Sequence, residues 1–160
     1  MAIITQADLE KFFPDLANYG LGSIADYISY AEADVIDYFS YIWFPNALAK
    51  FSQLNTGTNV NNPKFALPTF DMAKLNINLV KNLITFKCLG DYIFITLMKT
   101  TAEGEDSFYA RAVYFQDKYE QELARVTNAP IYDFNGDGVF DNLDISKANI
   151  GRPVITLVRR

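Results

Sequence analysis

Apolar residues recur at the spacing of an α-helix along several long segments, and this periodicity limits the fold more than any other feature. From Ser23 to about Phe44, one stripe repeats every three or four residues: Ile24, Ile28, Ala31, Val35, Tyr38 and Ile42. This spacing places the side chains on one helical face. Ser23 supplies an N-cap hydroxyl, and Asp26 lies near the positive end of the helix dipole. The segment predicts a long helix with one buried face.

The same helix has aromatic rings outside that stripe, among them Tyr30, Tyr41 and Trp43. A helix that is apolar on several sides is either central in its own fold or covered by a neighbouring subunit. Both readings are open from the sequence, and the second suits a protein that works in an assembly. Tyr is a residue that interfaces favour, and the chain contains ten.

Two further long helices are predicted, over residues 71–99 and from Asp106 or Ser107 to about Val126. The first has Gly90 as a point of bending or interruption. The second has an apolar seam made of Phe108, Ala112, Phe115, Tyr119 and Leu123. A short capped helix is expected from Thr5 to just before Pro14. Together these segments predict a mainly α fold, a helical bundle with antiparallel neighbours.

Residues 52–68 are rich in Asn, Thr, Gly and Pro and predict a long loop. Loops of this length are uncommon unless they are functional or disordered. The loop either reaches toward a partner or is a tolerated insertion.

Composition excludes several classes of function. The chain has no His, which removes Ser-His-Asp and Cys-His catalysis and the common His-ligated metal sites. A net charge of −5 disfavours a general nucleic-acid-binding surface. The single Cys, Cys88, lies in an apolar helical run and is expected to be a buried structural thiol. No pair of carboxylates is singled out for acid–base work, so a non-enzymatic protein is expected.

The N-terminal sequence lacks a basic region followed by an apolar stretch, and no run reaches 18 apolar residues. These features indicate neither a secretory signal nor a membrane span, and a soluble chain is expected.

Residues 133–144 follow the twelve-residue pattern of a calcium-binding loop. Oxygen ligands are expected from Asp133, Asn135, Asp137, the backbone carbonyl of Val139, Asp141 and Asp144. Gly138 would supply the sharp turn at the sixth position. Four carboxylates this close would repel one another without a cation. We therefore expect one structural calcium ion that pins the C-terminal segment, the alternative being a solvated acidic turn that binds nothing.

This loop resembles the EF-hand loop and, more closely, its dockerin variant, which also ends in Asp rather than Glu. Dockerins have two copies of the loop, whereas this chain has one, and Ala129-Pro130 separates it from the preceding helix. The resemblance implies, as an alternative function, a calcium-dependent dockerin-like module that binds another protein.

The C-terminus combines apolar β-prone residues with basic ends, after a brief helix expected at 145–150. The residues expected to contact a partner are Arg152, Val154, Ile155, Leu157, Val158, Arg159 and Arg160. Such a strand could add to the sheet edge of another chain or pack on its own domain. We expect a helical bundle domain at 1–128, followed by the calcium-type loop and an extended arm at 129–160.

Three stretches, ITQADLEKFFPDL, SIADYISYAEADVIDYF and RPVITLVRR, together resemble the head–tail connector (adaptor) proteins of tailed bacteriophages. The resemblance implies a homo-oligomeric ring in the neck of the virion, assembled in the bacterial cytoplasm and bound to the portal protein and a tail or stopper protein. DNA would pass through an acidic ring without sequence-specific binding. An unrelated virion or cell-surface assembly protein is a third reading.

Overall fold

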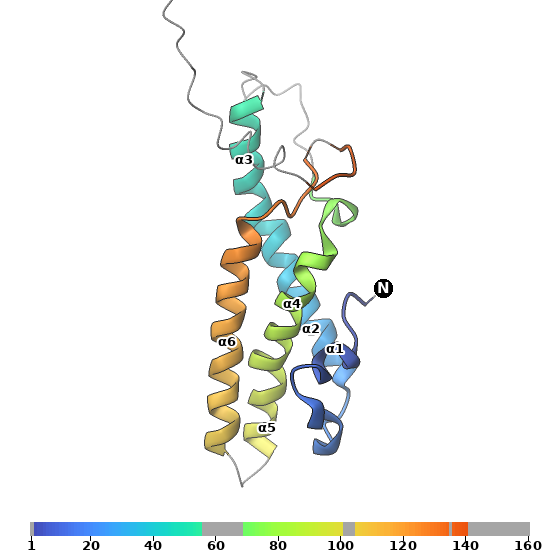
Figure 1. The fold of residues 1–160 in the computed structure, drawn as a ribbon, viewed down its shortest axis with the longest axis vertical. Coiled ribbons are helices and arrows are strands. Elements are labelled where there is room, and N and C mark those ends of the chain that lie inside the picture. Colours follow the sequence, from blue (N-terminus) through green and yellow to red (C-terminus); the bar gives the residue numbers. More distant parts are fainter. Residues whose placement is uncertain (1, 56–68, 101–104, 135, 141–160) are drawn as a thin grey trace, which may run out of the picture.

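Helices account for nearly all of the regular structure in the computed structural model, which describes residues 2–55, 69–100, 105–134 and 136–140 (Figure 1). The elements in chain order are α1 (Gln6–Glu10), the 3₁₀ helix η1 (Pro14–Tyr19), α2 (Ile24–Asp37), the π-helix η2 (Tyr38–Trp43), α3 (Phe44–Asn55), the 3₁₀ helix η3 (Met72–Lys74), α4 (Ile77–Lys87), the π-helix η4 (Cys88–Ile93), α5 (Phe94–Thr100) and α6 (Glu105–Thr127). The prediction of a mainly α helical bundle is confirmed. The expected helix at 145–150 and the C-terminal arm lie outside the described residues.

The elements α2, η2 and α3 follow one another as a single long helix. The predicted end near Phe44 is wrong, because the helix runs on to Asn55 and includes the first residues of the expected loop. Pro45 directly follows the wide turn of η2, in which the Phe44 N–H donates to the Phe39 carbonyl, five residues back. The Asn46 side chain donates a hydrogen bond to the Ile42 carbonyl oxygen at 2.8 Å. Figure 1 shows α3 projecting past the end of α6.

The π-helical turn η2 also changes which residues enter the core. A π turn contains about one residue more than an α turn and therefore rotates the following side chains. Ile42, predicted to be in the apolar stripe, is 56% exposed, whereas Phe39 and Phe44 are buried. The stripe is confirmed for Ile28 and Val35. The wide turn thus changes which residues of the long helix face the core from Phe39 onward.

The second predicted helix begins later than expected, at Ile77 rather than near Asp71. The backbone of the residues just before it pairs with a distant segment instead. The Asn76 N–H donates to the Ile131 carbonyl at 2.8 Å, and the Asp133 N–H donates to the Lys74 carbonyl at 3.0 Å. Gly90 lies within η4 and does not interrupt the helix.

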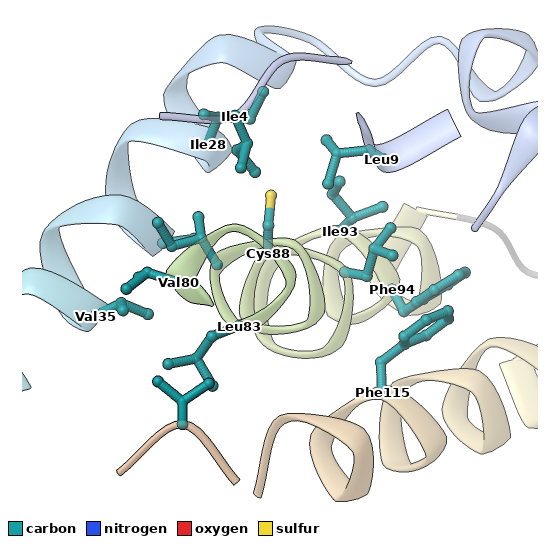
Figure 2. Close-up of a cluster of buried hydrophobic side chains, with 14 of the residues drawn as sticks. Ile4, Leu9, Ile28, Val35, Val80, Leu83, Cys88, Ile93, Phe94 and Phe115 are labelled. Carbon is teal, nitrogen blue, oxygen red and sulfur yellow. The ribbon is translucent and has the colours of Figure 1, made fainter. Parts of the chain in front are cut away.

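The helix formed by α4, η4 and α5 is central, because α2 and α6 both pack against α4 and η4. Figure 2 shows side chains from this helix meeting those of its neighbours: the Cys88 sulfur points toward Ile4 and Ile28, and the Phe94 ring faces Phe115. Cys88 is buried and unpaired, as predicted. The predicted seam of α6 is confirmed, with Phe108, Ala112 and Phe115 buried and Tyr119 and Leu123 packed against the core.

The predicted N-terminal capping at Thr5 is present. The Thr5 N–H donates to the Asp8 carboxylate at 3.0 Å, which is half of a capping box. The hydrogen bond from Lys11 and that from the Thr5 N–H lower the pKa of Asp8 from 3.8 to about 2. The Phe12 ring then packs edge-on against Phe86, with centroids 5.1 Å apart. The short N-terminal helix is thus fixed to the central helix.

Gly90 provides a test of the close packing between η4 and α6. A Cβ atom at this position would lie 3.0 Å from the Gln116 nitrogen and 3.3 Å from the Phe115 carbonyl carbon, both backbone atoms. We expect Gly90→Ala to lower the free energy of unfolding by about 1–3 kcal/mol, because overpacking outweighs the gain in helix propensity. Urea denaturation measures this change. Gly22→Ala is the control, since its Cβ would meet nothing within 4 Å. Equal stability of the Gly90→Ala and unmodified proteins would contradict this packing.

Cys88 provides a test of core burial. Burial, with a smaller effect from the charge of Glu32, raises the pKa of its thiol from 9.0 to about 12. Because the folded-state value is the higher one, the contribution of the protonated thiol to stability is complete below pH 9 and is lost as pH rises through 12. A chromogenic thiol reagent at pH 8 should react with the unfolded chain and only negligibly with the folded one. Rapid labelling of the folded chain, absent in Cys88→Ala, would show that the core is open.

Candidate metal centre

A cluster of aromatic rings supports the start of the predicted calcium loop. We call it the aromatic platform, and it consists of Trp43, Phe44, Phe70, Tyr132 and Phe134. The ring centroids of Tyr132 lie 4.9 Å from Phe134 and 5.0 Å from Phe44. The Tyr132 hydroxyl also accepts a hydrogen bond from the Asp71 N–H at 3.0 Å. The platform therefore fixes the loop against η2, α3 and the segment that precedes α4.

Asp133, the first residue of the predicted loop, is the organising residue of its described part. Its side chain is buried, and its two oxygens accept different backbone hydrogen bonds. Oδ1 accepts from the Gly136 N–H at 2.6 Å, and Oδ2 accepts from the Gly138 N–H at 2.9 Å. The chain therefore turns around this carboxylate.

The two glycines are required by the backbone of this turn. Gly136 has φ +77° and Gly138 has φ +79°, values in the left-handed region that favours glycine. Gly138 is at the position where the sequence pattern predicted a sharp turn, and its backbone agrees. Farther along, the Val139 N–H donates to Asp137 Oδ1 at 2.8 Å.

The described part of the loop has donors that suit calcium, a cation that prefers oxygen ligands. An ionised carboxylate has about four lone-pair sites, and the hydrogen bonds to Asp133 use two of them. Asp137 and the Val139 carbonyl are the other predicted ligands in the described residues. Within these residues no group of three acidic, His or Cys side chains converges on one point. Asn135, Asp141 and Asp144 lie outside them, so the full ligand set stays a prediction.

The predicted partner-binding residues of the arm also lie outside the described residues. They are Arg152, Val154, Ile155, Leu157, Val158, Arg159 and Arg160. Their role in binding a partner stays a prediction.

The structure brings together a polar cluster that the sequence did not predict. Lys87 forms an ion pair with Asp91 at 2.6 Å, and the Tyr92 hydroxyl donates to Asp34 at 2.6 Å. The Gln116 side chain donates to Asp91 at 2.9 Å and so connects α6. Burial lowers the pKa of Lys87, but the hydrogen bond and charge of Asp91 outweigh it, and the pKa is raised. These groups satisfy one another's hydrogen bonds and charges across three helices, and the network therefore links the helices to one another.

A groove lies beside the aromatic platform, along η2 and α3. Its volume is about 720 Å³, and its mainly apolar lining includes Ile36, Phe44, Leu48, Phe70 and Met72. Concave apolar surfaces of this size are suited to binding another molecule.

Comparison with known protein families, curated proteins and solved structures found no match to this chain. Among the described residues, no helix has the length and apolar character needed to cross a membrane.

Asp133→Ala tests whether this carboxylate organises the turn. We expect the free energy of unfolding, measured by urea denaturation in chelator, to fall by about 1–3 kcal/mol, because two backbone N–H groups lose a buried acceptor. Asp137→Ala is the matched comparison. Because the Asp137 side chain is exposed, its removal should lower the free energy of unfolding in chelator by less. Calcium should stabilise the unmodified protein but neither variant. If the turn does not depend on Asp133, the free energy of unfolding of Asp133→Ala in chelator will equal that of the unmodified protein.

Proposed function

We propose that this chain is a non-enzymatic structural subunit of the head–tail connector ring of a tailed bacteriophage. In this proposal it lies in the virion neck, between the portal protein and a tail or stopper protein, around the path of the DNA. The observation that carries the proposal is a set of large aromatic side chains exposed on the long helices.

Four tyrosines on these helices are more than half exposed: Tyr30 at 55%, Tyr41 at 77%, Tyr109 at 57% and Tyr114 at 54%. Burial of a Tyr ring is favourable in free energy, and its hydroxyl can form a hydrogen bond at the polar rim of an interface. Interfaces between proteins are enriched in this residue. Long helices with exposed rings fit a subunit whose neighbours cover them.

The groove beside the aromatic platform supports the same class of function. It lies where α3 projects past the end of α6 (Figure 1), at a position that another chain could reach. Its lining combines apolar side chains with Asp37 and Ser40 at its polar positions. An apolar centre with a few polar groups is typical of a protein interface.

The resemblance of three sequence stretches to connector proteins supports the particular assembly. One of them, residues 23–39, forms most of the long helix α2–η2, whose only charged residues are acidic. The net charge of the chain, −5, would let DNA pass without adhering to the ring, because phosphates repel carboxylates. The basic arm ending at Arg160 would dock on the portal protein.

In this proposal a structural calcium ion fixes the origin of the arm. Asp133 lies next to Tyr132 on the aromatic platform, so a cation held there would tie residues 141–160 to the bundle at one point. Calcium would supply the positive charge that lets several carboxylates share that point.

The direct test is the mass of the complex formed with a portal ring from the same source, in calcium and in chelator. We expect several copies to bind each ring, and fewer in chelator because the arm loses its fixed origin. Removal of residues 152–160 should abolish binding, whereas Gly22→Ala should not affect it. Failure to bind the ring under either condition would remove the connector assignment.

A calcium-dependent dockerin-like module is the second candidate, favoured by the hydrogen bonds around Asp133. It predicts a one-to-one complex with another protein that depends on calcium and on Asp137. The connector proposal predicts many copies on one ring, so the stoichiometry separates the two.

A further inference from the structure

The long helices α2 and α6 differ in the charges that they present, since α6 has basic as well as acidic residues. No Lys or Arg occurs between Lys11 and Lys50, so α2 and η2 have only acidic charges. In α6, by contrast, the basic residues are Arg111, Lys118 and Arg125, spaced seven residues apart. Seven residues are close to two helical turns, so these three side chains lie along one line on the helix.

Each line of charge includes exposed tyrosine and small or polar residues at spacings of three or four. We call the first line the acidic stripe, which consists of Asp26, Tyr30, Ala33, Asp37 and Tyr41. We call the second the basic stripe, which consists of Arg111, Tyr114, Lys118, Gln121 and Arg125. Lys118 is half-buried, and the other nine residues are exposed. A rise of 1.5 Å per residue gives both stripes lengths of about 20 Å.

Both stripes make surface contacts within the chain, and in the acidic stripe the Tyr30 ring lies 6.0 Å from the Tyr92 ring. In the basic stripe, Arg125 forms a surface ion pair with Glu122 at 2.7 Å, and Arg111 lies over the Phe13 ring at 5.2 Å. Lys118 lies over Tyr114 at 5.5 Å. Exposed contacts of these kinds contribute little free energy, so they can be exchanged for contacts with a partner.

The two stripes belong to different helices, α2 with η2 and α6, which both pack against α4 and η4. One partner that offers a complementary surface to both stripes is another copy of this chain. We propose that neighbouring copies pack with the acidic stripe of one against the basic stripe of the next. This contact deepens the proposed function and rests on it for ring closure, since a contact between unlike surfaces makes a ring when its rotation closes.

Charge and tyrosine have separate roles in the proposed contact. Opposite charges set the orientation and favour encounter, while the tyrosines supply apolar area that is buried on contact. Nucleic acid does not fit this pair of surfaces, because phosphates would be repelled by the acidic stripe.

Site-specific crosslinking tests the contact directly. Chains with Tyr30→Cys and chains with Tyr114→Cys are mixed at high concentration, alone and on a portal ring, and treated with a short bismaleimide. Heterodimers should form from the mixture, and neither variant should crosslink to itself. Buried Cys88 keeps the background low. Tyr109→Cys replaces Tyr114→Cys in the control, because Tyr109 is equally exposed but lies on the other flank of α6.

Charge reversal tests the electrostatic part. Asp37→Arg should reduce the heterodimer yield severalfold in the Tyr30→Cys chain, and Lys118→Glu in the Tyr114→Cys chain should restore it. Two results would overturn the contact. One is the absence of crosslinked heterodimer both in the free mixture and on the ring. The other is a crosslink yield with Tyr109→Cys equal to that with Tyr114→Cys. Crosslinking of the free chain without portal binding would remove the proposed function and leave the contact. Portal binding without crosslinks would remove the contact alone.

Discussion

Burial of the central helix, formed by α4, η4 and α5, is the constraint on which the rest of the bundle depends. Its side chains Leu83, Ile93 and Phe94 are fully buried because α2 and α6 cover it from two sides. The absence of a side chain at Gly90 lets the backbone of α6 approach η4 closely. This approach sets the position of α6 and therefore the direction in which its charged face points.

The aromatic platform connects this core to the C-terminal part of the chain. The π-helical turn η2 rotates Phe44 inward, and Phe44 then packs against Tyr132. Residues 131–133, the segment that contains Tyr132, pair with the backbone before α4, so that α4 begins only at Ile77. Asp133 follows at once and turns the chain around its carboxylate. A shift of helical register at η2 is therefore coupled to the place where the candidate metal centre begins.

The proposed functions use different surfaces of this one bundle. The described part of the candidate calcium loop lies at the end where α3 projects, whereas the acidic and basic stripes run along the sides of the bundle. A subunit with this layout could bind a neighbour through its sides and a portal ring through its end. The polar tie between Lys87, Asp91 and Gln116 holds the helices that present those sides.

The sequence by itself determined the helical class, the seam of α6, the burial of Cys88 and the glycine turn of the loop. These features depend on local periodicity and backbone preference, which neighbouring residues encode. It did not predict that Ile42 would be exposed or that residues 71–76 would precede the α-helix rather than form its first turns. The first depends on a π turn, and the second on backbone pairing with residues 131–133, far along the chain. Only tertiary structure decides such features, because their hydrogen-bond partners are chosen when distant segments pack together.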